Sequence, residues 1–175
     1  MTAPTLVVDH PDDVAARRAL AAELRRCRLR LGMTQDHLAR ILGITGEAVR
    51  GLEKRRDDSW QVMTVATRAR ALGRRLSLTL TGVEVPEAVY SRAEVERLVC
   101  LPVDADVLAV RLLVADLVRV RLALGLTLAE LGVRLGCSES GAHRRERTSE
   151  VSRLATLQQH ARALGGVLVV EVLPS

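Results

Sequence analysis

The chain has 175 residues, a formal net charge of +5 and a hydrophobic content of 48%. It contains no Phe, one Tyr and one Trp, so its core must consist of Leu, Val and Ala, a mixture that favours helices. The same scarcity of aromatic rings argues against a surface that binds single-stranded nucleic acid by stacking on its bases.

Residues 1–8 are expected to form a tail, and a first helix is predicted after it. The turn and cap residues His10 to Asp13 precede apolar positions spaced four, three and four residues apart, which share one face of a helix. The positions expected to face inward are Leu20, Leu24, Cys27 and Leu31.

Two short helices joined by a tight turn are predicted next. Thr34 can cap a helix from Gln35 to Leu42, because its hydroxyl can accept a hydrogen bond from a first-turn amide. Gly43 supplies the left-handed residue that ends this helix, and Thr45 starts the following one. Such a pair is typical of a helix-turn-helix. The expected inward positions are Leu38, Leu42, Ile44, Val49 and Leu52.

A fourth helix and a strand are predicted to complete this unit. A charged loop, 55–59, leads into a helical pattern from Trp60 to Leu72, whose apolar positions again share one face. From Arg74 to Thr81 the period changes to two, because leucines alternate with polar residues, and this pattern indicates a strand. The inward positions of the fourth helix are expected to be Val62, Val65, Ala69 and Leu72.

The whole unit occurs twice, which indicates a duplication. Five turn, cap and core residues recur 93 residues later: Gly32, Thr34, Leu38, Gly43 and Glu53 return as Gly125, Thr127, Leu131, Gly136 and Glu146. The second copy predicts a helix opened by Asp104 and Asp106 with Leu113, Leu117, Val120 and Leu124 inward, short helices started by Thr127 and Ser138, a fourth helix from Ser152 to Leu164, and a strand from Val167 to Val172.

The sequence therefore predicts a mainly α-helical protein of two tandem helix-turn-helix domains, each ending in one strand. The expected boundaries are 9–82 for the first domain, 83–101 for a linker with a short helix from Glu87 to Val99, and 102–175 for the second domain. Because a lone strand leaves its backbone groups unpaired, the two strands are expected to pair antiparallel, so that a monomer acts as a pseudo-dimer. The alternative is pairing with another chain, which would give a homodimer.

Signals for other classes of protein are weak. No run of eighteen apolar residues occurs and the N-terminus lacks the basic start of a signal peptide, so we expect a cytoplasmic protein without a membrane partner. Cys27, Cys100 and Cys137 share no short metal-binding spacing and are expected to be small core residues. The histidines are scattered, and His160 is expected on the outer face of the fourth helix. We therefore expect no enzyme, no catalytic residues, no metal and no cofactor.

A set of residues in the first copy follows a known family pattern: Thr34-Gln35, Leu38-Ala39, Leu42-Gly43-Ile44-Thr45, Val49 and Leu52-Glu53-Lys54. Through them this copy resembles the helix-turn-helix family of lambda repressor and Cro, also called the xenobiotic-response-element family. The resemblance covers roughly Leu20 to Leu72. The strand after the fourth helix is similar to that of HipB-type antitoxins, in which the strand pairs across a dimer.

The resemblance implies that the third helix enters the major groove of double-stranded DNA. The residues nearest the base edges would be Thr45, Gly46, Glu47 and Arg50. Arg50 could contact guanine through two hydrogen bonds, Gln35 would contact a phosphate, and Lys54 and Arg55 would add charge at the flank. All 26 basic residues except Lys54 are arginine, which suits a phosphate-bearing partner. The alternative is that arginine reflects a GC-rich gene and coats solvated helix faces.

The second copy departs from this pattern. Leu128 replaces Gln35, so the phosphate contact is lost there, and Arg145 replaces the inward Leu52. A polar and basic face remains where bases and phosphates would lie: Ser138, Glu139, Ser140, His143, Arg144 and Arg147. We expect this half to touch DNA but to read a different sequence, which would make the site asymmetric. The alternative is that it serves only as the strand-pairing partner.

These patterns predict a sequence-specific DNA-binding transcriptional regulator, most simply a repressor that occupies an operator. The alternative is an antitoxin or adaptor that binds a toxin or another protein partner and uses DNA binding to regulate its own operon. The apolar strand from Val167 to Val172, with Val167 and Val169 on the face expected to be wet, could mark a surface for such a partner.

Overall fold

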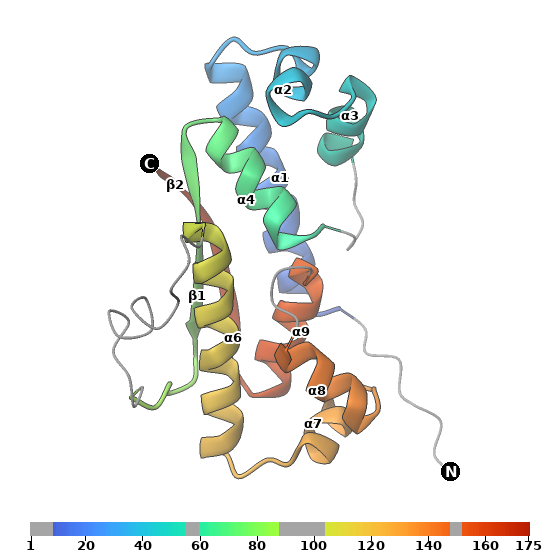
Figure 1. Cartoon of the computed structure of the whole chain (residues 1–175), viewed down its shortest axis with the longest axis vertical. Helices are drawn as coiled ribbons and strands as arrows, with labels where there is room; N and C mark the ends of the chain where they lie inside the picture. Colours follow the sequence, from blue (N-terminus) through green and yellow to red (C-terminus); the bar gives the residue numbers. More distant parts are fainter. Residues whose placement is uncertain (1–8, 55–59, 88–103, 148–151) are drawn as a thin grey trace.

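The computed structural model describes residues 9–54, 60–87, 104–147 and 152–175. Within these ranges the chain is mainly helical, with eight helices and one two-stranded antiparallel sheet (Figure 1). The first half contains α1 (Pro11–Arg30), α2 (Gln35–Leu42), α3 (Gly46–Lys54), α4 (Val62–Ala71) and β1 (Arg74–Thr81). The second half contains α6 (Ala105–Ala123), α7 (Leu128–Arg134), α8 (Glu139–Arg147), α9 (Leu154–Ala163) and β2 (Val167–Pro174). The predicted mainly helical class is confirmed.

The predicted caps and turns fix the ends of the short helices. At the start of α2, the Thr34 hydroxyl accepts a hydrogen bond from the His37 amide at 3.1 Å. At the start of α7, Thr127 and Glu130 form the expected reciprocal capping box. Gly43 follows α2 with a φ of 66°, a left-handed conformation that side chains other than glycine rarely adopt. The chain can therefore turn sharply into α3.

The two strands pair with each other, as predicted, and the register reveals an approximate two-fold axis. Leu78 of β1 lies opposite Val170 of β2, and these residues correspond to each other in the two copies, 92 residues apart. A second, isolated bridge joins Gln61 to Arg153, which also correspond at an offset of 92. A pair of corresponding residues that face each other must lie on the symmetry axis. The axis therefore passes through both places, as in a two-fold symmetric dimer.

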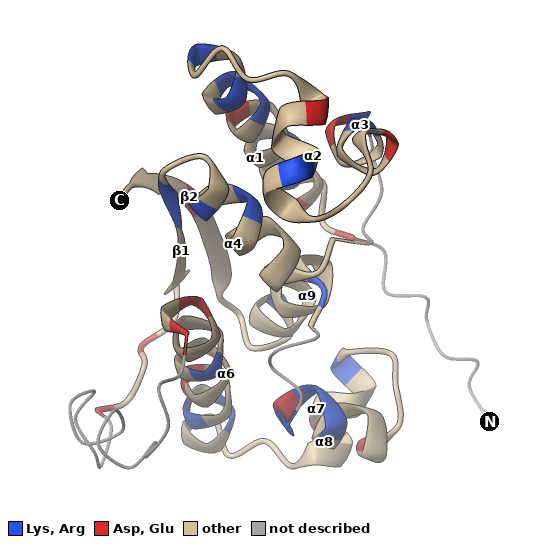
Figure 2. Cartoon of the chain, turned by 45° about the horizontal axis from the view of Figure 1, so that its top comes forward, with Lys and Arg blue, Asp and Glu red and all other residues tan. Residues whose placement is uncertain are grey.

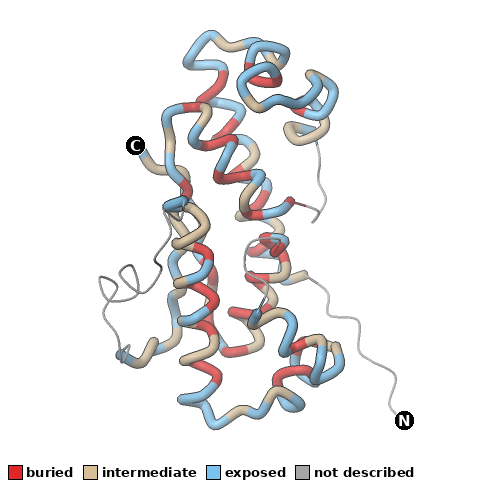
Figure 3. The backbone as a smooth tube through the Cα atoms, viewed as in Figure 1, coloured by how far each residue is buried: buried red, intermediate tan, exposed pale blue. Residues whose placement is uncertain are grey.

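The two halves exchange packing across this axis. Helix α1 packs on β2 and α6 packs on β1, whereas α4 and α9 pack on the strands of their own halves. The buried apolar residues of both halves consequently form one continuous cluster, which runs along α1, α4, α6, α9 and the sheet (Figure 3). Exchanged ion pairs lie at its rim, from Arg70 to Asp104 at 2.6 Å and from Arg162 to Asp13 at 2.9 Å.

Some element boundaries differ from the expectation. Helix α4 begins at Val62 rather than Trp60, because the backbone before it pairs with the other half: the Leu154 amide donates to the Trp60 carbonyl at 2.9 Å. Strand β2 continues past Val172 to Pro174, because its partner β1 extends back to Arg74. Residues 88–99 of the predicted linker helix, and Cys100, lie outside the described ranges.

Three residues expected to face inward are exposed. Leu31 and Leu124 are 53% and 51% exposed, because each follows the last turn of its helix. Ile44, just after the left-handed Gly43, is 40% exposed. The inward positions predicted for the fourth helix of the first half are all buried, as expected, and so are the corresponding residues of the second half, Leu154, Leu157, Ala161 and Leu164. In the described part of the chain, no helix combines the length and apolar character needed to span a membrane.

Candidate nucleic-acid interface

Helix α3 presents a polar face to solvent. Its first turn is capped by Thr45, whose hydroxyl accepts a hydrogen bond from the Ala48 amide at 3.1 Å. Val49 on the opposite side is completely buried and so fixes the rotation of the helix. Gly46 is half-buried, and a Cβ atom there would lie only 2.0 Å from Asp36 Oδ1. The predicted contact residues that are exposed are Thr45, Glu47, Arg50 and Lys54, whereas Arg55 lies outside the described ranges.

Helix α8 presents the corresponding face in the second half. The Ser138 hydroxyl accepts a hydrogen bond from the Gly141 amide at 3.2 Å, and Ala142 takes the buried position of Val49. Arg145 is half-buried, with Nη1 3.5 Å from Gln159 Oε1. All six predicted residues of this half are exposed: Ser138, Glu139, Ser140, His143, Arg144 and Arg147.

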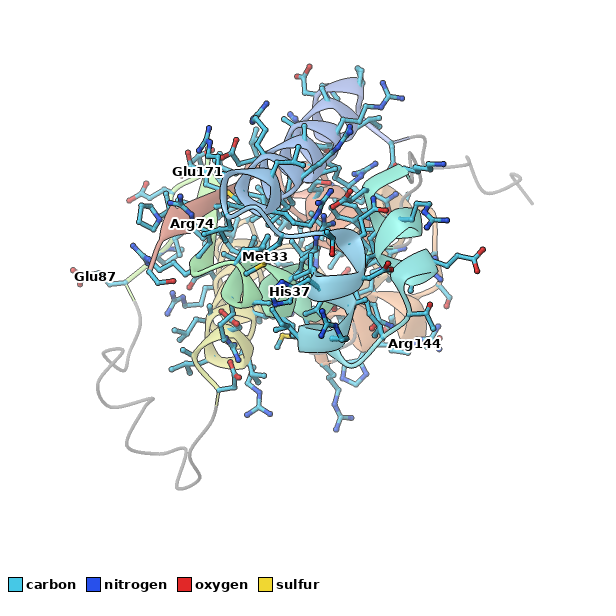
Figure 4. The ribbon with its side chains drawn as sticks, turned by 90° about the horizontal axis from the view of Figure 1, so that it is seen from above. Met33, His37, Arg74, Glu87, Arg144 and Glu171 are labelled. Atoms are coloured by element: carbon cyan, nitrogen blue, oxygen red, sulfur yellow. The ribbon has the colours of Figure 1, made fainter. Side chains whose placement is uncertain are left out.

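The two polar helices lie on the same side of the molecule. Figure 1 shows α3 and α8 at opposite ends of the long axis, both on the side away from the sheet. Seen down that axis in Figure 4, Arg144 lies on the side of α3, whereas Arg74 and Glu171 of the strands lie on the other side. Basic residues occur on both helices, interspersed with acidic ones (Figure 2). One elongated ligand could therefore contact both faces.

A buried ion-pair network holds α3 in place. Glu53 accepts hydrogen bonds at 2.8 Å from Arg28 Nε, at 2.9 Å from Arg28 Nη2 and at 2.8 Å from Arg68 Nη2. The side chains of Arg28, Glu53 and Arg68 are 6%, 3% and 2% exposed. Burial would raise the pKa of the Glu53 carboxyl, but hydrogen bonds from Arg28 and Gln35 outweigh it and hold this pKa below its usual value. Glu53 is therefore charged at neutral pH and ties α3 to α1 and α4.

Gln35 takes part in this network. Its Nε2 donates to Glu53 Oε2 at 2.8 Å, so one of its amide protons is engaged inside the protein. The contact of Gln35 with a phosphate stays a prediction, and in this structure the residue positions α3. In the second half this contribution is absent, because Leu128 occupies the corresponding position.

The second half keeps only the centre of the network. Arg121 donates to Glu146 at 2.6 Å and 3.1 Å, and also to the Leu126 carbonyl at 2.8 Å, just as Arg28 donates to the Met33 carbonyl. His160 stands where the first half has Arg68, and both of its ring nitrogens are buried without a hydrogen-bond partner among the described residues. Burial lowers the pKa of His160 to about 4, so the ring is neutral at pH 7.

This finding corrects the expectation that His160 lies on an outer face, because the side chain is only 1% exposed. The network itself was not expected from the sequence. A signal for it was present, since Arg28 recurs as Arg121 at the same offset that relates Glu53 to Glu146. A pair of opposite charges kept in both copies indicates a structural ion pair.

The two exposed faces together carry hydroxyl, carboxylate, imidazole and guanidinium groups. Such groups can bind base edges and phosphates in duplex DNA. Comparison with protein-family models, curated proteins and solved structures finds no match. The choice of function therefore depends on the geometry and chemistry of these faces.

Proposed function

We propose that this protein is a sequence-specific double-stranded DNA-binding regulator, in which α2–α3 and α7–α8 are two helix-turn-helix units of a single-chain pseudo-dimer. The observation that carries the proposal is the presence of two capped, polar helices on one face of the molecule, related to each other by an approximate two-fold axis. Each of these helices is fastened to the long first helix of its half by the same buried Arg–Glu pair. Rigid presentation of paired helices suits the major groove on successive turns of a duplex.

The residue roles follow from the exposed positions. In the first half, Thr45, Glu47 and Arg50 would face base edges, and Arg50 could discriminate guanine by about 1–3 kcal/mol. Lys54 would contact phosphate. In the second half, the reading positions would be Ser138, Glu139, Ser140 and His143, and the phosphate contacts would come from Arg144 and Arg147.

The two reading faces differ at corresponding positions, so the operator would be asymmetric. Arg50 corresponds to His143, Glu47 to Ser140, and Gly46 to Glu139. A protein that occupies such a site without a catalytic step would act most simply as a repressor. Symmetric half-sites are not expected, because the hydrogen-bonding groups offered by the two helices are different.

An antitoxin or adaptor is the second candidate, and the outer face of the sheet favours it. Val169 is 36% exposed on β2, opposite the exposed Thr79 of β1, and Val167 beside it is half-buried. This surface lies on the side of the molecule away from α3 and α8, so a protein bound there would leave both helices accessible.

The proposal is tested by selecting bound sequences from random duplex DNA and titrating the recovered site. Arg50→Ala and Arg144→Ala should each weaken binding. The loss for Arg50→Ala should be about 5–150-fold, and its thermal stability should be nearly unchanged. Arg75→Ala is the matched control, because Arg75 is an exposed arginine on the sheet. The logarithm of affinity should also fall steeply with the logarithm of salt concentration. No enriched sequence, or equal losses from all three variants, would reject the proposal.

A further inference from the structure

A basic groove of about 600 Å³ lies between α1 and the C-terminal end of α3. Its basic lining residues are Arg18, Arg25 and Arg26 from α1 and Lys54 from α3. Among the described residues, Arg18 and Arg25 take part in no ion pair, whereas Arg26 pairs with Glu23 at 2.5 Å. Glu53 reaches the groove, but Arg28 and Arg68 neutralise its charge. The exposed charge of the groove is therefore positive.

Apolar residues line the groove together with the basic ones. They are Ala21, Ala22 and Leu29, and Leu29 is 54% exposed although it is a large aliphatic residue. From Arg18 to Leu29 the lining positions extend over about three helical turns, or roughly 16 Å. This length, and the presence of exposed apolar and basic side chains in the same groove, are complementary to a short helix that carries leucines and carboxylates on one face. Duplex DNA would use the charge but not the apolar side chains.

The second half does not repeat this surface. Val118 replaces Arg25, Val114 replaces Ala21 and is 5% exposed, and Arg119 is bound to Asp116 on its own helix. We propose that the groove between α1 and α3 is the docking site of an acidic amphipathic helix from a partner protein, with one site per chain. The site is separate from the reading positions Thr45 to Arg50 and shares only Lys54 with the proposed DNA-binding residues, so peptide binding can be measured without DNA.

The test uses a synthetic fifteen-residue peptide with leucines on one helical face and glutamates elsewhere, labelled for fluorescence anisotropy. Its control is a peptide of the same composition in which the leucines are spread around the helix. We expect 1:1 binding of the amphipathic peptide to the full chain and at least tenfold weaker binding of the control. The double variant R18E/R25E and the variant L29S should each weaken binding at least tenfold, whereas R111E, at the position in α6 that corresponds to Arg18, should leave it unchanged.

Circular dichroism establishes that each variant is folded before the comparison is made. Equal binding of the two peptides, no binding of either, or no effect of R18E/R25E would overturn the proposal. Duplex DNA is the other anionic ligand that the basic residues of the groove could bind, and a titration of R18E/R25E with the selected DNA site tests this alternative. A tenfold loss of DNA affinity with a shallower salt dependence would identify the groove as a phosphate track and would also overturn the proposal.

Discussion

Replacing Glu53 with Gln should destabilise the protein more than the corresponding change at Glu146. The substitution keeps the size of the side chain but removes the negative charge that Arg28 and Arg68 share. These two arginines are only 6% and 2% exposed, so neither can regain full hydration without local unfolding. Breaking a buried ion pair by removing one partner costs about 3–5 kcal/mol. We expect Glu53→Gln to lie at the upper end of this range.

Glu146→Gln provides the internal comparison. It leaves one buried cation, Arg121, which is 10% exposed, because the neutral His160 stands where the first half has Arg68. Its cost should lie at the lower end of the range, so the two variants should differ by about 1–2 kcal/mol. Urea denaturation followed by circular dichroism at pH 7 measures both values, and the shared core should give one cooperative transition.

The pH dependence of stability provides a second test of the ion pairs that Glu53 forms with Arg28 and Arg68. The folded-state pKa of Glu53 is lowered from an ordinary value of 4.5, so its stabilisation is complete above pH 4.5 and is lost as the pH falls through the folded-state pKa. The free energies of unfolding of the wild type and of Glu53→Gln should therefore converge as the pH falls below 4.5 through the folded-state pKa of Glu53. Equal losses from Glu53→Gln and Glu146→Gln at pH 7 would refute the reasoning, because the second buried arginine would then contribute nothing.

Three further outcomes are expected. Burial lowers the pKa of His160 to about 4, so the unfolded chain takes up a proton at this residue at a higher pH than the folded protein does. The free energy of unfolding should therefore fall by about 3 kcal/mol between pH 6.5 and pH 4 because of His160 alone. In His160→Gln the free energy of unfolding should depend less on pH between 6.5 and 4.5, and an unchanged slope would exclude His160 as the cause. His160→Arg should lower the melting temperature at pH 7, because burial lowers the pKa of the equivalent Arg68 in spite of Glu53 and leaves two of its side-chain nitrogens without a hydrogen-bond partner in the described part of the chain; a rise would show that Glu146 compensates a second buried guanidinium. Gly132→Ala should lower the free energy of unfolding by about 1–3 kcal/mol in urea denaturation, because its Cβ would lie 2.8 Å from the Cys137 carbonyl oxygen. Gly46→Ala should lower it less, because its Cβ would meet the movable end of the Asp36 side chain. A larger loss of stability at Gly46 would contradict this reasoning.

Much of the fold could be predicted because its signals are local. Caps such as Thr34, left-handed glycines such as Gly43 and the helical spacing of apolar residues act within one or two turns. The repeat also allowed one long-range contact to be predicted. Each half contains a single strand, and pairing these two strands satisfies the backbone groups of both. Leu78 and Val170 correspond to each other in the two copies, and the symmetry of the repeat is enough to explain why they lie opposite each other.

The rest depends on contacts between distant segments, which periodicity does not encode. The start of α4 is set by a bridge between Gln61 and Arg153, 92 residues apart. The burial of His160 follows from the packing of α9 rather than from its own neighbours in sequence. At the candidate interface, the contact residues of α3 and α8 were predicted from the family resemblance. The hydrogen bond from Gln35 to Glu53 joins two different helices, and the sequence pattern did not predict it.

Helix α1 of the first half packs on strand β2 of the second half, and α6 packs on β1, so neither half has a complete hydrophobic core of its own. In a dimer of separate chains such an arrangement would dissociate on dilution, and both copies would have to share one sequence. Here assembly is intramolecular and does not depend on protein concentration. A substitution in α8 alters one face alone, so the two exposed faces can differ in sequence although the backbone keeps an approximate two-fold symmetry.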